Sequence, residues 1–179
     1  MRSVFVTTGA TVTFERLVKL SLDPKVLDLL SLQGYNKVIV QYGKSARAKE
    51  LFEDSIKNLN GSYQGEECLY KNIIIEGIPF TADVDSVISG ADLVLSHAGT
   101  GSILDTLRLK KKLVVVINDQ LMDNHQEEVA NSMMAGSHLI KSEPSLEKLL
   151  EALTLTETHD FTPLPTPKPN MIEQILQEL

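Results

Sequence analysis

Tryptophan is absent from the 179 residues of this chain, and cysteine occurs once. The lone cysteine, Cys68, cannot form a disulfide within the chain, which excludes the disulfide-rich secreted domains and favours a reducing compartment. No stretch approaches the roughly 20 consecutive apolar residues that a membrane-spanning helix needs. The apolar run at the N-terminus is too short for a signal peptide. We therefore expect a soluble chain, whose association with a membrane would require a partner.

Positive charge is also scarce. Lysine and arginine number 17 against 24 aspartate and glutamate residues, which gives a net charge of -7 and a pI near 5.1. Such a surface repels a phosphate backbone, so bulk electrostatics argue against a nucleic-acid partner. The length fits one ordinary domain, and a hydrophobic content of 42% is enough to bury a core without disulfides.

Short apolar runs alternate along the chain with longer segments of helical period. The runs are apolar almost throughout, which is typical of strands buried on both faces of a parallel sheet. This alternation predicts an α/β fold with a doubly wound, Rossmann-like parallel sheet. The predicted strands span residues 3–8, 37–42, 72–76, 92–96, 113–117 and 138–140; the predicted helices span 46–59, 83–89, 102–109, 124–135 and 145–154, after an N-terminal helical stripe that Pro24 interrupts; and 58–66 is a predicted loop.

Glycines follow four of the predicted strands. Gly9, Gly43, Gly77 and Gly99 each end an apolar run. The carboxyl ends of parallel strands meet at one edge of a sheet, and ligands of open α/β sheets bind beyond that edge. We therefore expect a ligand site there.

The first of these turns contains Thr8, Gly9 and Thr11 and joins a strand to a helix. Its glycine would let the backbone approach a phosphate at the positive end of the helix dipole, although such turns also arise for steric reasons alone. The turn matches neither the dinucleotide fingerprint nor the P-loop. The Gly-Lys-Ser sequence at 43–45 resembles the tail of a P-loop but lacks its upstream glycine. We interpret it as a turn and a helix start, and a phosphate contact by Lys44 is the less favoured alternative.

The segment from His97 to Asp105 carries the strongest pattern. Gly99 and Gly101 permit a tight turn after a strand, and Ser102 opens the predicted helix. An imidazole, bare backbone N–H groups and a carboxylate thus converge. A nucleoside diphosphate needs donors for its phosphates and acceptors for its ribose hydroxyls. In the alternative interpretation, Ser102 and Asp105 form a capping box that serves only the helix, and the residues alone leave both open.

A second polar run, at 118–126, follows the fifth predicted strand. Asp123, His125 and Gln126 belong to it, and such side chains read sugar hydroxyls, although polar runs are usually solvated loops. His125 with Glu128 could suggest a metal site, but no third ligand follows at a suitable spacing, so we expect no metal. We interpret the Asp-Val-Asp sequence at 83–85 as a helix cap rather than a metal–nucleotide site.

The C-terminal segment 161–179 differs from the preceding domain, residues 1–160. Prolines at alternate positions favour an extended, polyproline-like strap, and 170–179 has the apolar spacing of a short amphipathic helix. This segment either packs on its own domain or reaches a partner, and the sequence leaves both open.

These motifs resemble a known family. The His-x-Gly-x-x-Ser-x-x-Asp spacing from His97 to Asp105, followed by the polar cluster at 123–126, resembles the nucleotide-sugar signature of the two-Rossmann-domain (GT-B) glycosyltransferases. Residues 4–11 and 95–102 more closely resemble the eukaryotic subunits of the UDP-N-acetylglucosamine (UDP-GlcNAc) transferase that acts on dolichol-diphosphate-GlcNAc. The resemblance covers nearly the whole chain.

The resemblance implies a role for each candidate site residue. Asp105 would bind the ribose hydroxyls, where many relatives have glutamate. The other implied contacts are Thr8, Gly9 and Thr11 at the diphosphate; the backbone around Phe80 and Thr81 at the uracil; His97, Gly99, Thr100, Gly101 and Ser102 as donors to phosphate; and His125 and Gln126 at the GlcNAc, with Asp123 in the same cluster.

The resemblance also implies that half of the enzyme is elsewhere. A complete GT-B enzyme has an N-terminal domain that binds the acceptor and supplies the general base, whereas this chain begins at the first strand of the donor domain. The resemblance therefore implies an inverting transferase. This enzyme would add the second GlcNAc during assembly of the lipid-linked oligosaccharide for N-glycosylation. This enzyme would need a membrane-anchored partner subunit at the cytosolic face of the endoplasmic reticulum, but no cofactor or metal. The alternative is a non-catalytic nucleotide-binding or scaffolding module.

Overall fold

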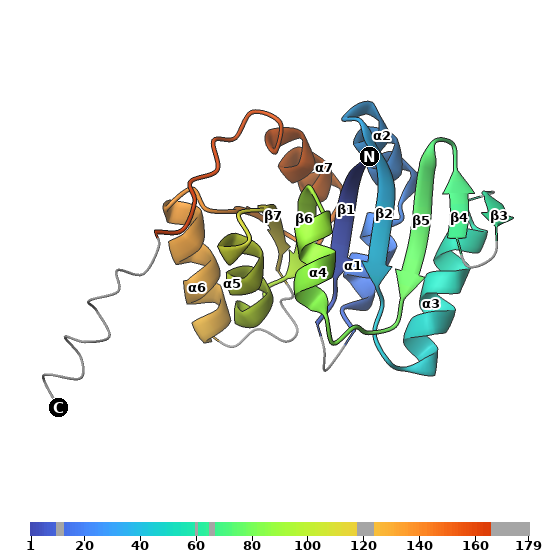
Figure 1. Cartoon of the computed structure of the whole chain (residues 1–179), viewed down its shortest axis with the longest axis horizontal. Helices are drawn as coiled ribbons and strands as arrows, with labels where there is room; N and C mark the ends of the chain where they lie inside the picture. Colours follow the sequence, from blue (N-terminus) through green and yellow to red (C-terminus); the bar gives the residue numbers. More distant parts are fainter. Residues whose placement is uncertain (10–12, 60, 65–66, 118–123, 166–179) are drawn as a thin grey trace, which may run out of the picture.

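The strands form one sheet in the order β3-β4-β5-β2-β1-β6-β7-β8 (Figure 1). The computed structural model describes residues 1–9, 13–59, 61–64, 67–117 and 124–165. The strands are β1 (Arg2–Thr7), β2 (Tyr35–Gln41), β3 (Ser62–Gln64), β4 (Glu67–Tyr70), β5 (Ile73–Ile78), β6 (Leu93–His97), β7 (Lys112–Val116) and β8 (Ile140–Ser142). The helices are α1 (Glu15–Ser21), α2 (Pro24–Leu32), α3 (Ala46–Lys57), α4 (Val84–Gly90), α5 (Thr100–Arg108), α6 (Asn124–Ala135) and α7 (Leu146–Leu155).

Six neighbouring strands, β5-β2-β1-β6-β7-β8 in sheet order, run parallel to one another. At the β5 edge, β3 and β4 add an antiparallel hairpin. In the central strand β1, Val4, Phe5 and Val6 are completely buried. Val4 and Val6 contribute to one core and Phe5 to another, because successive side chains of a strand point to opposite faces. Burial on both faces explains why the strand is apolar throughout.

Helices cover both faces of the sheet. One core includes residues of α1, α2, α3 and α7, such as Leu27 and Leu149. The core on the other face includes residues of α4, α5 and α6, such as Ile88 and Ile103. The predicted doubly wound α/β fold is therefore confirmed. None of the helices in the described ranges is both long and apolar enough to cross a membrane.

Local capping sets where helices begin. Pro24 occupies the first turn of α2, and the Asp23 carboxylate caps this helix by accepting a backbone N–H at 2.9 Å. Pro24 separates α1 from α2, as predicted, because proline is tolerated in a first turn but not in a helix interior. Ser45 caps α3 by accepting from the Ala48 N–H at 3.1 Å. The turn and helix start predicted at 43–45 are thus confirmed.

Three details of the predicted secondary structure are wrong. The segment 58–66 is not a loop throughout, since it contains β3, which pairs with β4. The short strand predicted at 138–140 begins later, as β8. Gly77 does not end a strand but lies within β5, paired with Val40. A Cβ atom on Gly77 would collide with the ring of Phe52, so this glycine allows α3 to pack closely on the sheet.

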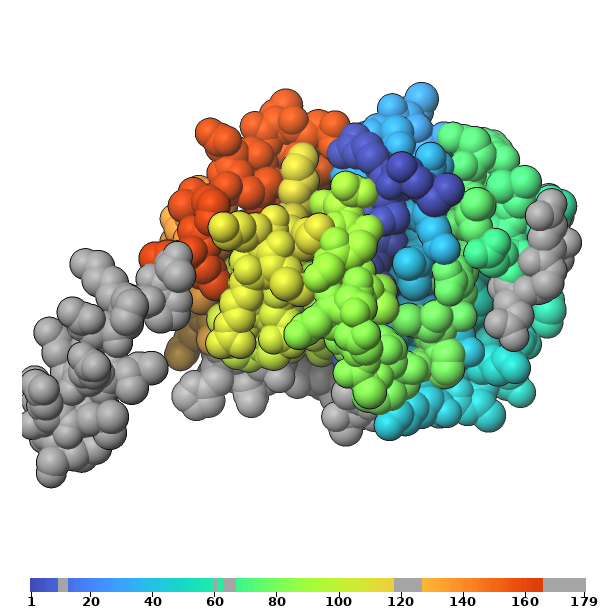
Figure 2. Space-filling model, in the orientation of Figure 1, coloured from blue at the N-terminus to red at the C-terminus, as the bar shows by residue number. Residues whose placement is uncertain are grey.

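Beyond α7 the chain crosses from one face of the sheet to the other. Phe161 packs against the core beneath α7, and Leu164 packs against the core beneath α5 and α6. The Thr162 N–H donates to the Ser137 carbonyl oxygen at 2.9 Å. Residues 161–165, the strap, therefore pack on their own domain (Figure 2). The rest of the predicted C-terminal segment lies outside the described residues.

Candidate functional site

The carboxyl ends of four adjacent strands bring together residues that are far apart in the sequence. The parallel strands β5, β2, β1 and β6 end at the lower edge of the sheet in Figure 1. At or just beyond these ends lie Phe80, Lys44, Gly9 and His97, in that spatial order. Neighbouring strands are about 4.8 Å apart, so these residues line one continuous edge.

The imidazole ring of His97 lies between two glycines. A Cβ atom on Gly9 would lie 2.7 Å from Nε2 and 2.9 Å from Cε1 of the ring, and a Cβ atom on Gly99 would collide with the same two atoms. Gly9 also has a φ of +91°, which residues with side chains rarely adopt. The two glycines therefore form a slot for the ring, and the ring connects the turn after β1 to the turn after β6.

Burial lowers the pKa of His97 below its ordinary value, and the backbone of Thr7 opposes this shift in part. The ring is therefore neutral near pH 7. Its Nδ1 atom is buried and has no hydrogen-bond partner in the described part of the chain. Because buried polar atoms are normally paired, His97 is a candidate for ligand contact.

The helix after His97 presents bare N–H groups. α5 begins at Thr100, with Gly99 at the N-cap, and no side chain caps it. The Ile103 N–H donates to the Gly99 carbonyl oxygen at 3.1 Å, which leaves the N–H groups of 100–102 without helical acceptors. Such a helix end binds anions, because its free donors and its dipole act together.

Ser102 and Asp105 lie within α5 rather than at its cap. The capping-box alternative is therefore wrong, because α5 begins at Thr100 and Gly99 is its N-cap. The Asp105 side chain is 43% exposed and its carboxylate lies 3.9 Å from the Arg108 guanidinium. An exposed ion pair of this length contributes little to stability, so the Asp105 carboxylate stays accessible.

Thr8 is completely buried, and its hydroxyl is already bonded within the fold. Its Oγ1 donates to the Gln41 carbonyl oxygen at 2.9 Å, and the neighbouring Thr7 Oγ1 donates to Gln41 Oε1 at 2.7 Å. These two hydrogen bonds link the end of β1 and the turn that follows it to the end of β2. Any contact of Thr8 with a ligand would therefore come from its backbone.

Phe80 and Thr81 follow β5. Phe80 is 36% exposed, and the Lys44 ammonium lies 4.0 Å from its ring centroid. Thr81 Oγ1 accepts from the Asp83 N–H at 3.0 Å, and the Asp83 carboxylate accepts from the Ser86 N–H at 3.2 Å, which confirms Asp83 as the cap of α4. The contact between Lys44 and Phe80 was not predicted, because no sequence signal shows that β2 and β5 are neighbours.

Four predicted site residues are not placed. Thr11 and Asp123 lie outside the described residues, and His125 and Gln126 are described only as backbone in the first turn of α6. Their contacts with a ligand stay predictions. Among the residues that the structure does describe, no group of three or more His, Cys, Asp or Glu side chains is arranged to hold a metal ion.

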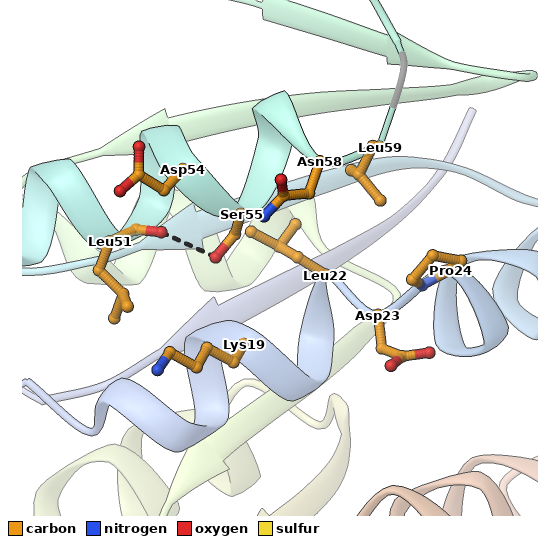
Figure 3. A pocket seen from close by; sticks show the side chains of 9 residues that line it. All are labelled: Lys19, Leu22, Asp23, Pro24, Leu51, Asp54, Ser55, Asn58 and Leu59. Atoms are coloured by element: carbon orange, nitrogen blue, oxygen red, sulfur yellow. Dashed lines mark hydrogen bonds between the residues drawn. The ribbon is translucent and has the colours of Figure 1, made fainter.

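A cavity of about 470 Å³ lies between the turn that joins α1 to α2 and the second half of α3 (Figure 3). Lys19, Asp23 and Asp54 are among its lining residues. Its lining includes no residue of the predicted site, and it lies near the C-terminal ends of α1 and α3 rather than at the edge that carries His97.

Residues 3–177 match the family model of the glycosyltransferase family 28 C-terminal domain. The chain belongs to this family. It is 36% identical, over 97% of its length, to the UDP-N-acetylglucosamine transferase subunit ALG13 of Kluyveromyces lactis, of which the match covers 95%. It is 38% identical, over 98% of its length, to the subunit of the same name from Yarrowia lipolytica, of which the match covers 83%.

Solved structures agree with the family. The fold resembles the solution structure of ALG13, with a TM-score of 0.76 and 31% identity over 98% of this chain and 94% of that one. MurG of Acinetobacter baumannii has a TM-score of 0.59 and 17% identity, over 87% of this chain and 41% of that one, which shows a shared fold. The domain is therefore of the GT-B C-terminal type, as the sequence motifs predicted.

Proposed function

We propose that this chain is the donor-binding subunit of a transferase that moves GlcNAc from UDP-GlcNAc to dolichol-diphosphate-GlcNAc. Membership of a glycosyltransferase family supports the reaction class, and the relatives named as UDP-N-acetylglucosamine transferase subunits support the donor. The observation that carries the proposal is the uncapped N-terminus of α5 beside the ring of His97 in its glycine slot. This arrangement offers a diphosphate the donors that it requires.

In this proposal the diphosphate lies over Gly9 and the start of α5. The N–H groups of residues 99–102 and one ring nitrogen of His97 donate to phosphate oxygens. Thr8 holds the first turn in place through its bond to β2. Asp105, one turn into the helix, accepts from the ribose hydroxyls, which its exposed side chain supports.

In this proposal the uracil and the GlcNAc of the donor lie on either side of the diphosphate. The backbone near Phe80 and Thr81 meets the uracil, and the partial exposure of Phe80 supports access to this position. Asp123, His125 and Gln126 form the cluster that faces the GlcNAc. Thr11 joins the diphosphate contacts from the first turn. These roles follow the family resemblance residue by residue.

The reaction is a displacement with inversion. The acceptor hydroxyl oxygen attacks the anomeric carbon from the side opposite the UDP, and its proton passes to a base on the partner subunit. The bond between the anomeric carbon and the phosphate oxygen breaks, and UDP leaves with the bonding electrons. The α5 N–H groups and His97 stabilise the charge that develops on UDP, and in this proposal these donors take the place of a metal ion or cofactor.

The acceptor site and the catalytic base belong, in this proposal, to a membrane-anchored partner subunit. The word subunit in the names of the relatives supports a partner. Because the acceptor is attached to a membrane lipid, the partner recruits this chain to the cytosolic face of the endoplasmic reticulum. Residues 1–160 form the donor domain, and 161–179 contribute a contact with the partner.

Saturation-transfer NMR of the full chain and of its reconstituted complex with UDP-GlcNAc tests donor binding. Asp105→Ala should weaken binding about tenfold, because the ribose hydroxyls lose a charged acceptor. Asp85→Ala is the matched control, since Asp85 is an exposed carboxylate in the first turn of α4. We would abandon the proposal if the wild-type complex bound no UDP-GlcNAc, or if Asp105→Ala bound it normally.

Turnover separates the transferase from a scaffold. Gln126→Ala should lower the turnover of the complex and leave UDP binding unchanged, because the glutamine contacts only the sugar. The chain without its partner should give negligible transfer. Unchanged turnover in the Gln126→Ala complex would favour the non-catalytic nucleotide-binding module.

A further inference from the structure

A nucleoside diphosphate brings several negative charges to a chain whose net charge is already -7. Burial keeps the His97 ring neutral, so the ring supplies a hydrogen bond without a positive charge. The N-terminus of α5 supplies only the partial charge of a helix dipole. These groups together contribute no full positive charge to the phosphates.

Arg47, near the start of α3, and Arg108, in the last turn of α5, already face carboxylates. Arg47 donates to the Glu15 carboxylate at 2.6 Å, and the Arg108 guanidinium lies 3.9 Å from Asp105. Arg16, in the first turn of α1, is exposed and has no such partner among the described residues.

Lys44 is held at the edge by a ring rather than by a carboxylate. Its Nζ lies 4.0 Å from the centroid of the Phe80 ring, and within the described ranges no carboxylate pairs with it. An exposed cation–π contact is weaker than a charge-assisted hydrogen bond to phosphate. An anion at this edge would therefore draw the ammonium away from the ring.

The backbone that carries Lys44 is fixed on both sides. Gly43 is buried with a φ of +108°, and a Cβ atom there would collide with Thr13 Oγ1. The Gly43 N–H donates to the Pro79 carbonyl oxygen at 2.8 Å. Ser45 on the other side caps α3. The fold thus sets the position of the Lys44 Cα atom and leaves the side chain to move.

The strand order places Lys44 beside the proposed phosphate position. Lys44 follows β2, Gly9 follows β1 and His97 ends β6, and β1 lies between the other two strands. Lys44 and His97 therefore follow the two strands that flank β1, the strand that Gly9 follows. We propose that Lys44 is a phosphate-binding residue, whose ammonium leaves the Phe80 ring to pair with the diphosphate of a uridine nucleotide over Gly9. This inference rests on the proposed function.

Titration of the full chain with UDP, followed by amide NMR shifts at low and high salt, tests this role. Lys44→Met should weaken UDP binding about tenfold and reduce its salt dependence, because a charge-assisted contact is lost. Lys44→Arg keeps the charge and should retain binding within about threefold of wild type. The amide spectrum of each variant reports whether its fold is intact.

Arg16→Met and Lys49→Met remove the same charge at other positions and are the controls. Lys49 lies on α3, 3.7 Å from Glu53, and both variants should keep most of the affinity. Equal losses of UDP affinity in all three charge-removing variants would show only an effect of the overall electrostatic field of the protein. That result would overturn the inference. Wild-type affinity in Lys44→Met would also overturn it, whereas a wild-type chain that binds no UDP would overturn the proposed function itself.

Discussion

The imidazole of His97 occupies the space in which a side chain on Gly9 would begin, with its Nε2 atom 2.7 Å from that Cβ position. Gly99 approaches the same ring atoms from the turn after β6. One side chain therefore orders two turns that follow adjacent strands of the sheet. Turns that are ordered before a ligand arrives lose less entropy when it binds.

Gly99→Ala should destabilise the fold through this contact. The new methyl group would collide with the His97 ring, and alanine is also unfavourable at an N-cap, so the free energy of unfolding should fall by about 2–3 kcal/mol. In a His97→Ala background the collision is gone, and a capping cost of about 1 kcal/mol should remain. Urea unfolding of the four proteins in this double-mutant cycle measures the difference.

Gly101→Ala is the control for that cycle. A Cβ atom on Gly101 would meet nothing within 4 Å, and alanine favours a helix more than glycine does. Its stability should equal or exceed that of the wild type. If Gly99→Ala cost the same free energy with and without His97, the ring would not occupy the slot.

Stability should also depend on pH through His97. Because burial holds the pKa of this residue below its ordinary 6.5, the unfolded chain binds the proton more readily than the folded one. The stability that comes from the neutral ring is therefore present above about pH 6.5. It is lost as the pH falls toward the lower folded pKa, by at most about 1.4 kcal/mol per pH unit.

Urea unfolding between about pH 7.5 and about pH 5.5 checks this expectation. Over that range the wild type should lose more stability than His97→Gln, whose side chain does not titrate. Equal pH slopes for the two proteins would contradict a neutral buried ring. The comparison removes the contribution of other titrating groups, since both proteins share them.

Thr8→Val should reduce stability and leave UDP affinity unchanged. Valine keeps the shape but lacks the hydroxyl that donates to the Gln41 carbonyl oxygen, and the loss should cost about 1–2 kcal/mol. Thr8→Ser keeps the donor and should lose less. Unfolding and UDP titration of both variants measure the two effects. A large loss of UDP affinity in folded Thr8→Val would instead place the hydroxyl on the ligand.

Much of the fold was predictable because burial on both faces leaves a continuous apolar run, as at Val4–Val6, and because Pro24 fixes a helix boundary. The β3–β4 hairpin was missed because its strands are only three and four residues long, too short to show a clear alternating pattern. Gly77 resembles a turn glycine in sequence. Its close contact with Phe52 depends on how α3 packs, which no local pattern shows.

The sequence predicted where in the fold the candidate site residues lie, but not the contacts that these residues make. Strand-end glycines and the motif from His97 to Asp105 predicted a shared edge of the sheet, and the structure brings Gly9, Gly99 and His97 together there. The capping-box pattern of Ser102 fitted the sequence but not the fold, because α5 starts earlier, at Thr100. The buried hydroxyl of Thr8 depends on strand order, which local sequence does not encode.

Truncation at two points should separate folding from recruitment. Deleting 161–179 removes Phe161 and Leu164, which pack against the two cores, and should lower the free energy of unfolding by about 2–4 kcal/mol. Deleting 166–179 leaves these contacts in place and should preserve stability. If the partner contact proposed for 161–179 lies beyond residue 165, both truncated chains should fail to co-sediment with membranes that contain the partner.

The full chain with Phe161→Ala is the matched control for these truncations. It should lose stability, because a partly buried aromatic contact is removed, and yet should sediment with the membranes as the wild type does. This pattern would assign recruitment to the final residues rather than to the packing of the strap. Full membrane recruitment of the chain that ends at residue 165 would place the partner contact on another surface, because such a chain keeps every contact that the strap makes with its own domain.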